Sequence, residues 1–159
     1  MTVNAAHRML HYARSGVSCV DCHMPYQRVG AIKITNHHVR SPMLNVNKSC
    51  QTCHHRPEEE LKNNVHTIQK NHLQMKDQLM DALVEFINDL EIAKKNKAVK
   101  PETLKAAQNL QREAQFLTDF VESENSAGFH APQEAARLMV KAMDKIRQGQ
   151  RLLRSGDVK

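Results

Sequence analysis

The sequence of 159 residues predicts an all-α fold, with loops in its first third and long helices in the remainder. Two observations support this expectation. After Pro57, apolar residues recur every three or four positions in three successive runs, which is the spacing of amphipathic helices. Before Pro57 nothing alternates strand with helix, and all four cysteines lie in two short motifs. We therefore expect two regions, residues 1–55 and residues 56–159.

The two motifs are CxxCH pentapeptides, Cys19–His23 and Cys50–His54. Two thiols at this spacing can add to the two vinyl groups of one haem, and the adjacent histidine can then bind the iron. The pattern predicts two covalently attached c-type haems. Their attachment points are Cys19, Cys22, Cys50 and Cys53, and their proximal ligands are His23 and His54.

A zinc site and a pair of disulfides are the alternatives. Two CxxC pairs can form a four-cysteine zinc site, although the usual gap between the pairs is shorter. That interpretation leaves the histidine after each pair unexplained. Redox-active dithiols are typical of a βαβ context, which this sequence lacks. Haem attachment therefore explains more of the motif than either alternative.

The composition agrees with a cofactor-filled protein. The chain has no Trp, two Tyr and four Phe, and its mean hydropathy is −0.61. Two porphyrins would supply the missing apolar bulk in the first region. The net charge is +6, but no basic run with interleaved aromatics indicates nucleic-acid binding. A basic surface instead suits an anionic substrate or an acidic redox partner.

No run of apolar residues is long enough to span a membrane, and the first sixteen residues lack the apolar core of a signal peptide. Covalent haem attachment normally requires export, which predicts a periplasmic location. We therefore expect that an export signal was removed or that the natural N-terminus lies upstream of Met1.

Taken in order, residues 2–15 have the spacing of a helix, and residues 24–49 are expected to be irregular apart from a short extended piece at 31–35. A helix of about ten turns is expected to begin after Pro57 and to end near Lys95. Its apolar seam contains Leu61, Val65, Ile68, Met75, Leu79, Ala82 and Phe86, with His72 as the one polar member. Two further helices are predicted, from Pro101 to about Ser123 and from Pro132 through Leu152, joined by a break at 126–131.

Ten histidines are available, and imidazole is the expected ligand on the open side of each haem. His130 stands alone in the break before the last helix, where the backbone is held by Gly128 and Pro132. His66 is expected to be a surface residue, and His72 a tolerated seam or interface residue. His55 is a less favoured ligand, because its neighbour His54 already faces the iron. The candidates for the distal positions are His7, His11, His37, His38 and His130.

Three segments carry a resemblance to a known family. Residues 15–26 resemble the fourth-haem segment of ammonia-forming pentahaem cytochrome c nitrite reductases. Residues 35–42 with residues 50–54 resemble the continuation to their fifth haem, and residues 128–134 resemble their C-terminal histidine joint. The resemblance covers essentially the whole chain. Octahaem relatives share this segment, so a pentahaem and an octahaem parent both stay open.

The resemblance implies roles for three histidines. His130 would be the distal ligand of the haem on Cys19 and Cys22, and His11 that of the haem on Cys50 and Cys53. The family's histidine falls where this chain has Tyr12, so the choice between His11 and His7 stays open. His37 would reach a haem of a preceding segment, with His38 as the alternative.

The resemblance also implies an activity and partners. The chain would be the electron-transfer and C-terminal portion of an enzyme that reduces nitrite to ammonium, with a homodimer interface on its long helices. The family's catalytic CxxCK haem and its calcium ligands have no counterpart in this sequence, so we expect this chain alone to be inactive. Its partners would be an upstream catalytic haem segment and a membrane-associated or soluble cytochrome electron donor. The alternative functions are a free-standing dihaem electron-transfer cytochrome and a zinc-binding structural module.

Overall fold

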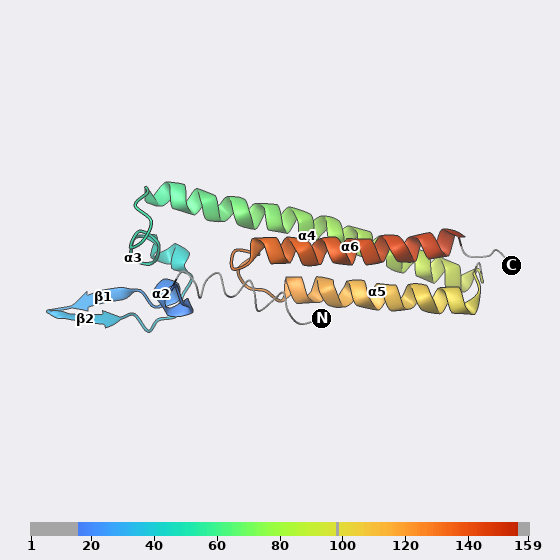
Figure 1. Cartoon of the computed structure of the whole chain (residues 1–159), viewed down its shortest axis with the longest axis horizontal. Coiled ribbons are helices and arrows are strands. Elements are labelled where there is room, and N and C mark those ends of the chain that lie inside the picture. Colours follow the sequence, from blue (N-terminus) through green and yellow to red (C-terminus); the bar gives the residue numbers. More distant parts are fainter. Residues whose placement is uncertain (1–15, 98, 156–159) are drawn as a thin grey trace. The chain divides into compact units, whose positions relative to one another are not determined.

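The computed structural model describes residues 16–97 and 99–155, and it divides after Asn64 into two compact units. The helix expected over residues 2–15 lies outside the described residues. The expected all-α class is confirmed, because helices form every element except one small hairpin (Figure 1). No described helix combines the length and the apolar character that crossing a membrane requires.

The first unit contains two short helices, a hairpin and a 3-10 turn. The helices are α2 (Cys19–His23) and α3 (Val46–Ser49), and η1 (Pro42–Leu44) precedes α3. The hairpin pairs β1 (Tyr26–Val29) with β2 (Ile32–Thr35), with Val29 opposite Ile32. Gly30, at φ +61°, provides the positive φ that the first position of a tight two-residue turn needs. The extended piece expected at 31–35 is therefore present, but its partner strand β1 was expected to be irregular.

The second unit is made of three long helices, α4 (Glu58–Lys95), α5 (Pro101–Glu122) and α6 (Pro132–Ser155), of which α4 begins in the first unit. Within this unit the three helices run side by side (Figure 1). Three glutamates lie in the first turn of α4 and two lysines in its last turn, which complements the helix dipole at both ends. Proline occupies the first turn of α5 and of α6. The sequence spacing therefore predicted all three helices.

One apolar core joins the three helices. Small residues of α5 and α6 allow close packing, since Ala107, Ala114 and Ala142 are all 0% exposed. The large core side chains come mainly from α4. The core consists of Leu79, Leu83, Phe86, Leu90, Ala107, Ala114, Val121, Met139, Ala142 and Ile146.

Polar contacts also cross between the helices of the second unit. Lys76 of α4 pairs with Glu122 of α5 at 2.7 Å, and Lys145 of α6 pairs with Glu113 of α5 at 2.7 Å. Gln150 of α6 donates to Asp89 of α4 at 3.1 Å. These contacts fix the register of the helices around the apolar core.

The predicted seam of α4 is correct at Leu79, Phe86 and His72, which is 4% exposed, but it is wrong at Met75. Met75 is 39% exposed because it borders a hollow of about 270 Å³ at the start of α6, which is lined also by Pro132 and Gln133. Leu83 and Leu90 are core residues that the expected seam did not include.

Candidate haem-binding site

The first CxxCH motif is wound into the single turn of α2. Residues three and four positions apart lie on one face of a helix, so Cys19, Cys22 and His23 project from the same side. The turn is braced at its N-terminus, where the carboxylate of Asp21 accepts hydrogen bonds from the backbone N–H of Ser18 at 2.6 Å and from its hydroxyl at 2.7 Å. These bonds, with the hydroxyl contributing most, lower the pKa of Asp21. The local fold therefore presents two thiols and one imidazole together.

The second motif is wound in the same way after α3. The N–H of His54 donates to the carbonyl of Cys50 at 2.9 Å, which closes a helical turn over the motif. The hydroxyl of Thr52 donates to the carbonyl of Lys48 at 2.7 Å. Val46, 1% exposed, anchors the helix that carries the motif. Cys50 and Cys53 thus also lie on one turn together with His54.

The two motifs lie near each other within the first unit. Burial raises the pKa of the Cys22 thiol, and the nearby Cys50 raises it further. Burial also raises the pKa of Cys50, with a further contribution from the carboxylate of Glu58. All four cysteines are free thiols. Thiols with raised pKa values stay protonated at neutral pH until they react.

The surroundings of the first motif fit a large apolar cofactor. A hollow of about 250 Å³ is lined by Cys19, Val20, His23, Met24 and Val39. Within residues 16–64 only Pro25, Val46 and Ser49 are buried. Large apolar side chains instead face outward, namely those of Val17, Val20, Tyr26, Val29, Ile32, Ile34, Val39 and Leu44. A porphyrin would cover such surface, so the residues present fit haem.

The four cysteines do not form a zinc-like cluster in the described part of the chain. Over residues 16–97 and 99–155, no three side chains of Cys, His, Asp or Glu gather closely enough to hold a metal ion. A structural zinc site needs four ligands at about 2.0–2.3 Å in a tetrahedral arrangement. The arrangement of the thiols as two separate pairs, each beside a histidine, fits two haems.

Three predicted ligand histidines share one feature. In each, the ring Nδ1 lies 3.0 Å from an oxygen that can only accept: the carbonyl of Arg40 for His23, the carbonyl of Thr35 for His37, and the carboxylate of Glu124 for His130. Nδ1 therefore carries the proton, and the lone pair is on Nε2. Iron-binding histidines in proteins are held in this way, because the bond at one nitrogen orients the ring and makes the other nitrogen more basic.

The remaining histidines are placed as follows. His54 is exposed on its turn, and His38 is exposed with its backbone N–H donating to the side chain of Asn36 at 3.0 Å. His11 and His7 lie outside the described residues. His55 is exposed, and so is His66, for which exposure was expected. The ring-to-carbonyl bond thus favours His37 over His38 as a ligand.

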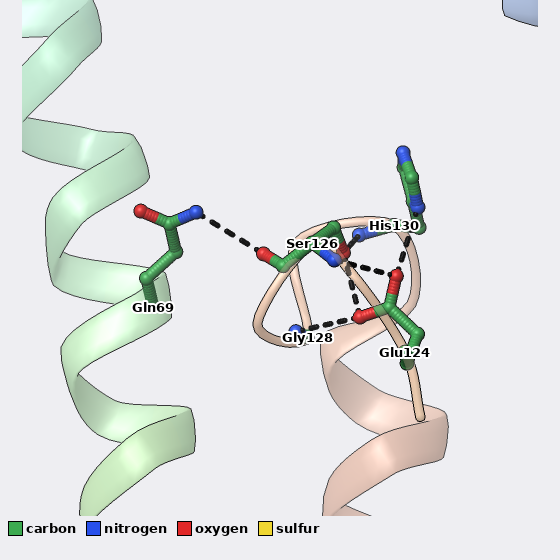
Figure 2. A network of polar contacts seen from close by, with 5 residues as sticks. All are labelled: Gln69, Glu124, Ser126, Gly128 and His130. Atoms are coloured by element: carbon green, nitrogen blue, oxygen red, sulfur yellow. Dashed lines mark hydrogen bonds and ion pairs between the residues drawn. The ribbon is translucent and has the colours of Figure 1, made fainter. Parts of the chain in front are cut away.

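The joint that carries His130 is more elaborate than the sequence indicated (Figure 2). The backbone takes left-handed conformations at Ala127 and Gly128, with φ +50° and +79°. The side chain of His130 is 60% exposed, and its backbone N–H donates to the hydroxyl of Ser126 at 2.9 Å. Gln69 of α4 donates to the carbonyl of Ser126 at 3.1 Å. The role of Glu124 was missed, because an acidic residue after a helix end carries no specific signal in the sequence.

This fold and these attachment motifs define a c-type cytochrome that carries more than one haem. The chain belongs to the cytochrome c552 family, whose sequence pattern it matches over residues 6–157. It is 36% identical to cytochrome c-552 of Parabacteroides distasonis over 137 residues, which cover 86% of this chain and 28% of that protein. It is 38% identical to cytochrome c-552 of Maridesulfovibrio salexigens over 143 residues, which cover 87% of this chain and 27% of that protein.

A solved structure is also similar. Cytochrome c nitrite reductase from Desulfovibrio desulfuricans, described as the catalytic subunit NrfA with two calcium sites, superposes with a TM-score of 0.82 at 26% identity. The match covers 91% of this chain and 31% of that one. The chain thus spans between a quarter and a third of the length of these relatives.

Proposed function

We propose that this chain is the electron-transfer and C-terminal portion of a periplasmic nitrite reductase that forms ammonium, and that it holds two haem c groups. The observation that carries the proposal is the winding of both CxxCH motifs into helical turns, the first of them with Nδ1 of its histidine, His23, bonded to a carbonyl oxygen. The similarity to a cytochrome c nitrite reductase supports the reaction. When bound, haem iron supplies one-electron exchange between its ferric and ferrous states.

The residues of the chain have distinct roles in this proposal. Cys19 and Cys22 hold one haem and Cys50 and Cys53 the other, through thioether bonds. His23 and His54 would each bind one iron, and the resemblance assigns His130 and His11 as the second ligands. Two imidazoles on each iron would leave no position for a substrate, which suits an electron relay. Nitrite would therefore react at a haem carried by an upstream segment.

Haem content and ligation test this assignment. After periplasmic expression with a haem-attachment system, a pyridine haemochrome assay should find two haems per chain. His130→Ala should keep both haems attached but convert one of them to high-spin or water-ligated iron, seen in the Soret and charge-transfer bands. His66→Ala is the control, since this exposed residue of α4 should change neither spectrum. A fully low-spin His130→Ala protein would remove His130 from the ligand set.

Activity separates the proposal from its alternative, a free-standing dihaem carrier. The chain alone should not turn over nitrite with reduced viologen, and adding the catalytic segment encoded upstream should restore turnover. Turnover by the chain alone would show that nitrite reacts within this chain, which would contradict the proposal. An upstream reading frame without a catalytic haem motif would favour the dihaem carrier.

We also propose a homodimer through α4. Four apolar residues of α4 are exposed, namely Leu73, Met80, Val84 and Ile87. They are spaced by seven, four and three residues, so they form one heptad stripe beside the buried face. A second copy of this stripe is its natural cover, because identical heptad seams pair in antiparallel or parallel coiled coils.

The dimer has a matched test. Val84→Glu should shift the haem-loaded protein from dimer to monomer in sedimentation equilibrium. Ile92→Glu is the control, because Val84 and Ile92 are both 56% exposed but Ile92 lies outside the heptad stripe. A wild-type monomer, or equal effects of the two variants, would refute this interface.

A further inference from the structure

The carboxylate of Glu124 is the centre of the joint between α5 and α6 (Figure 2). One oxygen accepts from the N–H of Ser126 at 2.9 Å and lies 3.0 Å from Nδ1 of His130. The other accepts from the hydroxyl of Ser126 at 2.8 Å and from the N–H of Gly128 at 2.9 Å. Four donors therefore converge on one side chain. Both oxygens are held, so the carboxylate cannot turn away from the imidazole.

This carboxylate acts only as an acceptor in the joint. The N–H groups of Ser126 and Gly128 and the hydroxyl of Ser126 all donate to it, which is the surrounding that an ionised carboxylate requires. A bond from a neutral imidazole to a fixed anion is stronger than one to a neutral carbonyl. His130 thus differs from His23 and His37, whose Nδ1 atoms face uncharged backbone carbonyls.

We propose that Glu124 is a positioning residue, which orients His130 as an iron ligand and lowers the reduction potential of the haem that His130 binds. The proposal rests on the ligand role of His130 proposed above. An anion at Nδ1 draws the ring proton toward itself and makes Nε2 a more basic donor. A more basic ligand stabilises ferric over ferrous iron, so the haem that His130 binds should have a lowered potential.

The test is a spectroelectrochemical titration of the haem-loaded chain. Glu124→Gln should change the ferric-to-ferrous ratio of one haem by roughly tenfold or more at a fixed potential. For a one-electron couple this is a rise in midpoint potential of about 59 mV. The second haem should keep its potential, and both irons should stay low-spin. An unchanged titration in a haem-loaded Glu124→Gln chain would overturn the proposal.

Two further variants separate charge from structure. Glu122→Gln removes a carboxylate two residues away that pairs with Lys76, and it should leave both potentials unchanged. Ser126→Ala removes the hydroxyl that braces the loop but keeps the anion beside His130, and it should shift the potential much less than Glu124→Gln. Equal shifts in Ser126→Ala and Glu124→Gln would mean that Glu124 acts only by holding the loop, and would refute the tuning role.

A proton NMR measurement tests the contact without relying on a folded variant of Glu124. An imidazole N–H held by a carboxylate resonates far downfield, so the reduced wild-type protein should show such a proton that His130→Ala lacks. Its absence from the wild type would contradict the proposal. If His130→Ala left every haem property intact, the ligand role of His130 itself would fail. If His130→Ala converted one haem to high-spin iron but Glu124→Gln had no effect, only the role of Glu124 would be refuted.

Discussion

Replacing Gly149 of α6 with alanine should destabilise the helical unit, although alanine is the better helix former by about 1 kcal/mol. A Cβ at this position would lie 2.0 Å from Cζ of Phe86 and below 3 Å from two more atoms of the same ring. Phe86 is 0% exposed, so the ring has no open space into which to retreat. Overpacking costs about 1–3 kcal/mol, and a contact this short belongs at the upper end. The expected net loss in the free energy of unfolding is about 2 kcal/mol.

Urea unfolding of the haem-loaded chain, followed by far-ultraviolet circular dichroism, measures this loss as a lower midpoint with an unchanged slope. Asn109→Ala is the control, because this exposed position of α5 receives only the gain in helix propensity. The double variant with Phe86→Leu should show a favourable coupling between the two sites, since the smaller side chain relieves the contact. A higher midpoint for Gly149→Ala would refute the reasoning, because it would show that Phe86 does not need the space at Gly149.

Three more outcomes follow from the helical unit. Ile146→Ala should lower the free energy of unfolding by about 2–5 kcal/mol in the same urea assay, since Ile146 is 1% exposed in the core. Gly128→Ala should cost at least about 1–2 kcal/mol for the left-handed φ of +79°, with a further cost because its Cβ would lie 2.4 Å from Nδ1 of His72, and thermal melts should show the loss. Burial lowers the pKa of His72 below its usual 6.5 and is the largest influence on it. The charge of Lys76 lowers this pKa further, whereas Glu124 and Glu122 raise it by less than burial lowers it. The unfolded chain therefore takes up this proton first, so stability should be complete above pH 6.5 and fall as the pH drops through the lowered pKa. His72→Gln should flatten that part of the pH profile, and an unchanged profile would contradict the assignment.

The long helices could be predicted from sequence because their signals are local. Pro101 and Pro132 mark helix starts, and the apolar spacing between them follows one periodicity. Which seam positions are covered depends on where the neighbouring helices begin. Met75 has the right spacing but lies beside the start of α6, so it is left partly exposed.

The haem-attachment turns could also be predicted, since cysteines and histidine lie within five residues of each other. The partners of the histidines could not. The bond between His130 and Glu124 depends on two consecutive left-handed residues that fold the loop back on itself. The bond between His23 and Arg40 joins residues seventeen positions apart through a loop with no periodic signal. Such contacts arise from loop geometry, which residue types specify only weakly.

The scarcity of buried residues in the first unit has a consequence for biogenesis. With only Pro25, Val46 and Ser49 buried among residues 16–64, this stretch has too little apolar burial of its own to offset its loss of chain entropy on folding. The helical unit, by contrast, has a core of its own. We therefore expect cofactor delivery to precede the final folding of this stretch, with the thiols accessible to the attachment enzymes until then. Chains that miss their cofactors keep an open, protease-sensitive N-terminal unit on a folded helical one, so a degrading protease can tell immature molecules from finished ones.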